Sequence, residues 1–453
     1  MVQSLNFKTQ IVLKDYFYQK DIEHRILISE LSNFEINVLQ EILHDSLRIS
    51  IEHLAENLDV SSDILIPVLD SLKRTKLFKR EGSTIIVDKE LRKYYEFQME
   101  KFNPKFEPNI EFIQNSLSNV PLNVLLLWYT IPRTSNNIFS SIINECLRTP
   151  KVYRQYMHEL QFKDPILHSI IKDLYEAANY KLSSKEIISK YSLTREEFEK
   201  HLLLLEYHFI CCLSYQYVDE HWQEVITPFA EWLEYLQTEK NLKPLPIQQN
   251  EEVIPTCQNE FGFIEDLTTI LTTLHKNKTP LENISNLNFN RPEHQDYLKK
   301  KLLQLEFVKQ NKQNLVATNK GLLWSRKSLQ ERITCFAVDP NNYVHGFENS
   351  SLWNLRTIHA IEKSLRHFKL LDWVDLNDFL KSLLITIGNT QPITLQKKGT
   401  KWKYVLPEYS AQELDFVSRV IMERCLELGI VMTGTYKNKP CFHLTQFGKQ
   451  FIY

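Results

Sequence analysis

The sequence predicts a mainly α-helical protein with small β-hairpins, arranged as four similar modules in tandem. Apolar residues recur at helical spacing in successive groups of segments, and each group is followed by a short hairpin rich in β-branched residues. The chain has 453 residues but only 9 glycines, which favours the helical class over large β-sandwiches. A chain of this length is expected to hold about three or four domains.

Residues 34–95 show the plan of a module most clearly. Three helices are predicted by apolar residues at helical spacing, namely Ile36, Leu39, Ile42 and Leu43, then Ile51, Leu54 and Leu58, then Leu65, Leu69 and Leu72. Residues 76–87 predict a two-stranded hairpin, and Asp88 is placed to cap an exit helix. Residues 1–32 precede this module as an arm, which fits either an edge strand or a packing segment.

Composition and periodicity divide the whole chain into six parts. We predict the arm with module 1 at residues 1–102, a helical connector at 103–169, module 2 at 170–237, a linker at 238–262, module 3 at 263–338 and module 4 at 339–453. Prolines interrupt the long helices of the connector, and the polar linker lacks periodicity. Module 4 carries an insertion at residues 393–407 that is predicted to form a hairpin.

The modules can be compared where each hairpin ends. An apolar strand meets a capping residue at Asp88, Thr227, Thr318 and Thr445, and the last two begin the pattern T-x-x-G that ends at Gly321 and Gly448. The spacing between these four positions is irregular, which excludes a regular solenoid and indicates related modules with different insertions.

The segments at residues 59–78, 315–324 and 442–451 make the chain resemble tandem winged-helix proteins. It is more similar to the non-catalytic multi-winged-helix subunits that accompany helicases and transcription machinery than to a compact one-domain repressor. The resemblance implies a winged-helix fold for the four modules, and either DNA association or docking of a protein. It does not choose between these two functions.

Charge and motifs exclude several classes of protein. Lys plus Arg is 54 and Asp plus Glu is 56, so the chain lacks the basic excess of a nucleic-acid coat. We expect an intracellular protein, cytoplasmic or nuclear, because no apolar run is long enough for a membrane span, the N-terminus does not look like a signal peptide, and the 7 cysteines have no CxxC spacing. Nucleotide-binding and catalytic motifs are also missing, so we predict no enzyme activity, no cofactor and no metal.

The third helix of each module tests the choice between DNA and protein, because a winged helix that reads DNA places this helix in the major groove. In module 1 the helical period turns Asp63, Pro67 and Asp70 outward. Residues 34–77 also hold twice as many acidic as basic residues. Carboxylates on this face would repel phosphates, so we predict that it packs against, or binds, a protein partner.

The third helix of module 2 is apolar around most of its circumference. Leu203 and Leu204 lie on or near its outward side. A helix of this kind is usually buried. We therefore predict that Leu203 and Leu204 contact another module or a protein partner.

Module 3 and the insertion in module 4 are the candidates for DNA contact. Basic residues outnumber acidic ones between positions 291 and 332, and a solvated basic face is the alternative reading. The predicted phosphate contacts are Lys299, Lys300, Lys301, Lys309, Lys312, Lys320, Arg326, Lys327, Lys397, Lys398, Lys401 and Lys403, with Trp402 as a stacking residue. An ordinary hairpin with Trp402 packed into module 4 is an equally good reading of the insertion.

Two functions follow from these observations. The first is a non-catalytic DNA-associated protein of transcription, repair or replication that contacts the phosphate backbone through module 3. The alternative is a protein-interaction scaffold that docks a helicase or polymerase without binding DNA itself.

Overall fold

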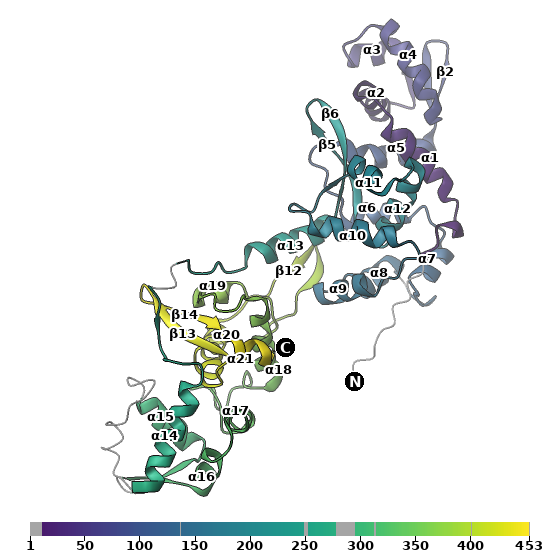
Figure 1. The fold of residues 1–453 in the computed structure, drawn as a ribbon. Coiled ribbons are helices and arrows are strands. Elements are labelled where there is room, and N and C mark those ends of the chain that lie inside the picture. Colours follow the sequence, from purple (N-terminus) through teal and green to yellow (C-terminus); the bar gives the residue numbers. More distant parts are fainter. Residues whose placement is uncertain are drawn as a thin grey trace. The chain divides into compact units, whose positions relative to one another are not determined.

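The computed structural model describes residues 11–135, 137–248, 252–277, 295–311, 314–399 and 401–452. These residues form two compact units (Figure 1). Unit 1 comprises Met1–Gln237 and Thr394–Val405, and unit 2 comprises Thr238–Ile393 and Leu406–Tyr453. Both units are mainly helical with small antiparallel sheets, as the sequence predicts. Among the described residues, no helix combines the length and the apolar character that a membrane span requires.

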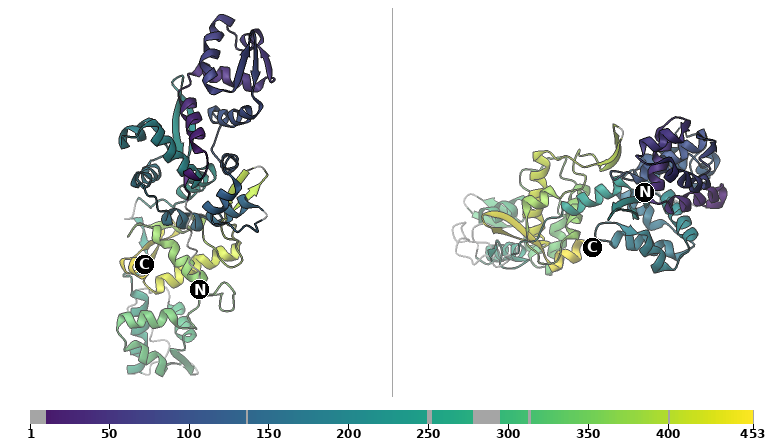
Figure 2. Two further views of the ribbon diagram at one scale, coloured as in Figure 1. Left: turned by 90° about the vertical axis from the view of Figure 1, so that its right-hand side faces the viewer. Right: turned by 90° about the horizontal axis from the view of Figure 1, so that it is seen from above.

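Module 1 lies in unit 1, and its elements can be followed in Figures 1 and 2. In chain order they are α2 (Asn33–His44), β1 (Arg48–Ser50), α3 (Ile51–Asn57), α4 (Ser62–Leu72), β2 (Phe78–Glu81), β3 (Thr84–Val87) and α5 (Lys89–Met99). The strands pair antiparallel in the order β1-β3-β2. The Asp88 side chain caps α5 by accepting the N–H groups of Glu90 and Leu91, which confirms its predicted role.

Module 2 repeats this element order. Its elements are α10 (Pro165–Glu176), β4 (Leu182–Ser183), α11 (Ser184–Tyr191), α12 (Arg195–Tyr207), β5 (Cys212–Val218), β6 (His221–Thr227) and α13 (Ala230–Asn241). The sheet order is β4-β6-β5. As in module 1, the third strand of the module therefore lies between the first and the second strand. A capping box of Thr194 and Glu197 begins α12.

The arm and the connector complete unit 1. The described part of the arm contains η1 (Leu13–Asp15) and helix α1 (Tyr18–Ser29), so this part is a packing segment and not an edge strand. The connector holds the predicted helices, as α6 (Ile110–Leu117), α7 (Leu122–Trp128), α8 (Ile138–Cys146) and α9 (Pro150–Glu159). Short turns η2 (Lys73–Thr75) and η3 (Glu100–Phe102) follow α4 and α5.

Unit 2 contains modules 3 and 4, which share one hydrophobic core. The described elements of module 3 are α14 (Gly262–Asn277), α15 (Gln295–Gln304), β8 (Val308–Asn311), β9 (Asn314–Ala317), α16 (Asn319–Ser325) and α17 (Leu329–Val338). Module 4 consists of α18 (Leu355–Ser364), η7 (Leu365–His367), β10 (Val374–Asp375), α19 (Leu376–Lys381), α20 (Ala411–Arg419), the π-helix η8 (Val420–Cys425), β13 (Val431–Tyr436), β14 (Lys439–Leu444) and α21 (Gln446–Ile452).

The sheet of module 4 has the same strand order as the sheets of modules 1 and 2, and one strand more. Its order is β10-β14-β13-β7, where β7 (Ile254–Pro255) comes from the predicted linker. Val253 and Cys257 beside β7 are buried. The segment at residues 238–262 is therefore not a free linker throughout, because part of it belongs to the folded body of unit 2.

The insertion forms the predicted hairpin, from β11 (Thr394–Lys398) and β12 (Lys401–Val405), but the hairpin belongs to unit 1 and not to module 4. Leu395 and Tyr404 pair across its strands and are buried. The Tyr404 hydroxyl donates to the carbonyl oxygen of Leu147 at 2.8 Å, and the Leu395 N–H donates to that of Arg148 at 2.8 Å. The Tyr404 ring also packs against Trp232 of α13.

A buried carboxylate lies beside this hairpin and makes unit 1 sensitive to pH. Burial raises the pKa of Glu231 to about 7. The carboxylate accepts the Ile110 N–H at 3.1 Å, which lowers the pKa, but the effect of burial is larger. Because the folded pKa exceeds the unfolded one, the folded state holds an extra proton between pH values of about 4.5 and 7. The stability of unit 1 is therefore expected to fall as the pH rises through this window.

We expect Glu231→Gln to raise the free energy of unfolding by about 1–3 kcal/mol at a pH of about 8, and to change it little at about 4.5. Glutamine keeps an acceptor for the Ile110 N–H without the buried charge. Denaturation at both pH values measures the effect. The matched control is Glu234→Gln on the same helix, where the half-exposed carboxylate pairs with Lys403. Equal stabilisation at both pH values would contradict the assignment.

Candidate interaction surfaces

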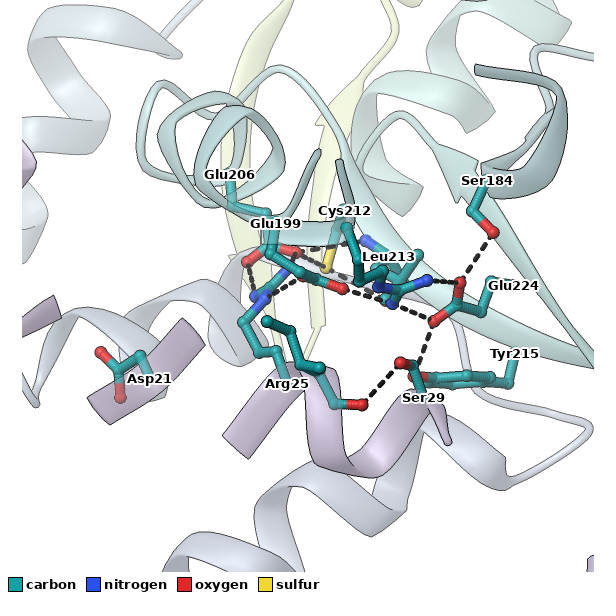
Figure 3. A network of polar contacts seen from close by, with 12 residues as sticks. Asp21, Arg25, Ser29, Ser184, Glu199, Glu206, Cys212, Leu213, Tyr215 and Glu224 are labelled. Atoms are coloured by element: carbon teal, nitrogen blue, oxygen red, sulfur yellow. Dashed lines mark hydrogen bonds and ion pairs between the residues drawn. The ribbon is translucent and has the colours of Figure 1, made fainter. Parts of the chain in front are cut away.

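Helix α1 covers the third helix of module 2 through a buried ionic network. The Arg25 guanidinium of α1 donates to Glu199 at 2.6 Å and to Glu206 at 2.8 Å, and all three side chains are buried. Figure 3 shows Arg25 reaching from α1 to these two carboxylates of α12. Glu206 also accepts the Leu213 N–H at 3.2 Å. The network fixes α1 to α12 and to the start of β5.

A second arginine extends this network toward the hairpin of module 2. Arg195 donates to Glu199 and, at 2.6 Å, to Glu224 of β6. Glu224 in turn accepts from the hydroxyls of Ser184 at 2.7 Å and Tyr215 at 3.2 Å (Figure 3). Every carboxylate in the network has a cationic or hydroxyl donor, which a buried charge requires.

Opposite charges overcome the effect of burial on the acidity of these groups. Burial alone would raise the pKa of Glu206, but the charges of Arg25 and Lys101 and its hydrogen bonds hold that pKa below its ordinary value. Burial would lower the pKa of Arg25, but Glu206 and Glu199 raise it. Glu206 and Arg25 are therefore both charged in the folded protein at neutral pH.

The structure distinguishes the two alternatives predicted for Leu203 of α12. Leu203 is buried by other parts of the chain, so it is not available to a partner, and Leu204 is half-buried. The burial of this helix was predicted, but the predictions did not include Arg25, Glu199 or Glu206. These residues could have been identified in the sequence as charged residues at core-facing positions of apolar helices, because such residues are rarely buried unless they are paired.

The third helix of module 3, α15, is also engaged by other segments of its unit. Lys301, predicted to contact phosphate, is only 2 % exposed and forms an ion pair with the buried Glu427 at 3.0 Å. Its ammonium group also donates to the carbonyl oxygen of Tyr343. Gln304 of α15 donates to the same carbonyl oxygen at 3.0 Å. Lys301 is thus a structural residue, and its prediction as a DNA contact is wrong.

The third helix of module 4 runs through α20 and the π-helix η8, and it contacts several segments of unit 2. Glu427, just beyond η8, accepts from Lys301 and from the Tyr297 hydroxyl of α15. Arg424 pairs with Glu362 of α18 at 3.4 Å, and Glu423 accepts the His345 N–H at 3.0 Å. The third helices of modules 3 and 4 are therefore joined to each other within the unit.

The third helix of module 1 differs from the other three. On α4 the predicted partner residues Asp63, Pro67 and Asp70 are exposed, and Ile64 between them is 56 % exposed. Asp70 pairs with Lys73 at 2.6 Å, and Leu65, Leu69 and Leu72 point into the core as predicted. The outer face of α4 is thus an exposed surface of two carboxylates with an apolar residue and a proline.

The other predicted phosphate contacts of module 3 lie on several elements. Lys300, Lys309, Arg326 and Lys327 are exposed, and Lys299 is partly buried beside Asp296. Lys320 pairs with Asp339 at 2.8 Å and also donates to a backbone carbonyl of Leu305. Lys312 lies outside the described residues. Four basic side chains of this set are therefore exposed and, among the described residues, without an ion pair of the kind that holds Lys299 and Lys320.

The hairpin lysines are partly neutralised by acidic residues of unit 1. Lys397 pairs with Glu111 at 2.7 Å, and Lys403 pairs with Glu234. Lys398 and Lys401 are exposed and face each other across the strands. Trp402 and its cross-strand partner Lys397 share the face of Leu395 and Tyr404, whereas the other three lysines lie on the opposite face. Trp402 therefore cannot stack on a base that those three lysines hold.

The described residues offer no grouping of three or more His, Cys, Asp or Glu side chains that could hold a metal ion. His208 and Cys211, which are three residues apart in the sequence, lie in the core. The His208 Nδ1 atom is 3.0 Å from the Tyr156 hydroxyl, and burial lowers the pKa of His208 to about 3. This histidine is a neutral packing residue.

Comparisons of the chain with protein-family models, with curated proteins and with solved structures found no match. The assignment of a function therefore depends on the surfaces described above.

Proposed function

We propose that this chain is a non-catalytic adaptor of tandem winged-helix modules that docks a protein partner, such as a helicase or polymerase, through the outer face of α4. The repeated element order of modules 1, 2 and 4, with sheets in which the third strand lies between the first and second, supports the winged-helix interpretation. Module 3 has a matching hairpin and exit helix among its described residues.

One observation carries this proposal: the third helices of modules 2, 3 and 4 make ionic contacts with other segments of their units, whereas the outer face of α4 is exposed. That face presents Asp63, which repels a phosphate backbone, and Asp70, whose charge is partly neutralised by Lys73 and Arg80. Ile64 and Pro67 add apolar surface that a protein partner can bury. Protein docking is therefore favoured over base reading in a DNA groove.

Photo-crosslinking tests this docking surface. A photoreactive residue in place of Ile64 in the full chain, expressed in its native cells, is expected to crosslink a discrete protein. The matched control replaces Leu323, which is similarly exposed on α16 of unit 2. The double charge reversal D63K and D70K is expected to reduce the Ile64 crosslink by about tenfold, because it removes the complementary charges. Equal crosslinking from both positions would refute the proposal.

Phosphate contact by module 3 is the second candidate, since Lys300, Lys309, Arg326 and Lys327 are all exposed. Replacing these four residues by alanine is expected to weaken binding to duplex DNA and to reduce its salt dependence. The control is Lys363→Ala, an exposed lysine of α18. No binding of the unaltered chain at an ionic strength of about 50 mM would eliminate this candidate.

A further inference from the structure

The open edges of the sheets are protected in two different ways. The edge strand β2 has the sequence FKRE, and its charged residues discourage pairing with a further strand. The edge strand β5 is uncharged, and Phe102 of η3 stacks on its Tyr215 at 3.9 Å between ring centroids. Strand β13, with the sequence VMTGTY, is uncharged as well and is covered by β7. The edge of β13 is therefore suited to pairing with an extended segment.

The backbone of β13 is adapted to the close approach of such a segment. Gly434 pairs with Pro255 and Thr435 with Ile254, and the Thr256 N–H donates to the carbonyl oxygen of Thr433 at 2.8 Å. A Cβ atom on Gly434 would lie 2.8 Å from the carbonyl oxygen of Ile254. Glycine at position 434 thus leaves room for a strand at this edge.

Side chains beside β7 also cover a small apolar cluster on the sheet. Val253 packs with Trp373 and the fully buried Cys441, with Ile247 at the margin. The Ile247 N–H donates to the carbonyl oxygen of Trp373 at 2.8 Å. Removal of β7 would expose an aromatic and aliphatic surface next to an unpaired strand edge.

The contact that β7 makes is short. Only two of its residues pair with the six-residue strand β13. Ile254 is 71 % exposed and Pro255 is exposed as well, so the two residues of this strand contribute little apolar burial themselves. An extended segment with apolar residues at alternate positions could make the same backbone hydrogen bonds and fill the same cluster.

We propose that the outer edge of β13 is a strand-binding site, that β7 occupies it in this structure, and that its ligand is an extended apolar segment of a partner protein. The ligand replaces β7, pairs antiparallel with residues 433–435, and places an apolar side chain on Trp373 and Cys441. This site is separate from the face of α4 and does not depend on its function.

Thiol labelling and peptide binding test this site in the full chain. Val253→Ser weakens the packing of β7 on the cluster and is expected to increase the alkylation rate of Cys441 at least tenfold, measured by mass spectrometry. The matched control is Ile254→Ser, which changes the exposed neighbour and should leave the rate unchanged. Circular dichroism establishes that each variant is folded.

The probe is a fluorescein-labelled peptide of residues 252–258, EVIPTSQ, with serine in place of the cysteine. We expect it to bind the Val253→Ser chain at least tenfold more tightly than the unaltered chain and to restore protection of Cys441. Adding G434V, or the milder G434A, should abolish binding. Unchanged alkylation, binding that is insensitive to both glycine substitutions, or dimerisation of the Val253→Ser chain without peptide binding would overturn the proposal.

Discussion

Arg25→Ala is expected to lower the free energy of unfolding of unit 1 by about 3–5 kcal/mol at neutral pH. The substitution leaves Glu199 and Glu206 buried, with Glu206 deprived of the guanidinium that donates to it at 2.8 and 3.0 Å. Leaving a buried carboxylate without its cation costs more folding free energy than the ion pair contributes to stability. Guanidinium denaturation followed by circular dichroism measures the loss, and hydrogen exchange at the α12 amides identifies the unit that unfolds.

The pH dependence separates this charge effect from lost packing. The folded pKa of Glu206 is below its ordinary value, so its contribution is present above the unfolded pKa of about 4.5 and is lost as the pH falls through the folded pKa. Without Arg25 the burial of Glu206 raises its pKa, and protonation then relieves the buried charge. We expect the cost of Arg25→Ala to shrink as the pH falls toward about 4.5.

A double-mutant cycle supplies the control. Glu206→Gln removes the charge that Arg25 compensates while nearly preserving the side-chain volume. If the network is electrostatic, Arg25→Ala should cost clearly less in the Glu206→Gln background than in the unaltered chain. Equal costs in both backgrounds, together with a cost independent of pH, would show that Arg25 acts only through packing.

Local sequence patterns predicted the helices and hairpins well because they depend on neighbouring residues. The spacing of Leu65, Leu69 and Leu72 identified both the core face of α4 and the exposure of Asp63 and Asp70 on the opposite side. The burial of α12 also followed from its composition. These are properties of single helices, and a 3.6-residue period describes them.

Contacts between distant segments could not be predicted in the same way. Arg25 and Glu206 are separated by 181 residues, and Lys301 and Glu427 are separated by 126. A sequence does not distinguish a buried lysine from an exposed one. The count of basic residues in module 3 therefore overestimated the number of positive charges on its surface. The hairpin was found by its alternating pattern, but its place in unit 1 depends on Tyr404 and Leu147, which no local pattern joins.

The T-x-x-G pattern has a physical explanation in the structure. The hydroxyls of Thr318 and Thr445 accept the N–H groups of Gly321 and Gly448, at 3.2 and 2.8 Å, and so cap the exit helices α16 and α21. The Thr445 hydroxyl also donates to the carbonyl oxygen of Gly429 at 2.6 Å, which ties the cap to the end of the third helix. The glycine then permits close contact between two backbones.

Gly448→Ala is expected to destabilise unit 2 by about 3 kcal/mol, because overpacking a close backbone contact forces the elements apart. A Cβ atom at this position would lie 2.0 Å from the carbonyl oxygen of Ile430, and this oxygen belongs to rigid backbone, not to a flexible side chain. Alanine is otherwise the better helix former, so propensity alone predicts stabilisation. The sign of the change in denaturation midpoint therefore distinguishes the two effects.

Gln446→Ala is the matched control, because Gln446 is exposed on the same helix and alanine there removes atoms without adding any to the contact. Gly321→Ala should behave like Gly448→Ala, since its Cβ atom would lie 2.4 Å from the carbonyl oxygen of Phe307. If both glycine variants were as stable as Gln446→Ala, the close approach of each exit helix to the backbone that follows the third helix could not be what requires glycine. A loss at both positions would mean that T-x-x-G combines a helix cap with a steric requirement, and that the pattern marks equivalent junctions in modules 3 and 4.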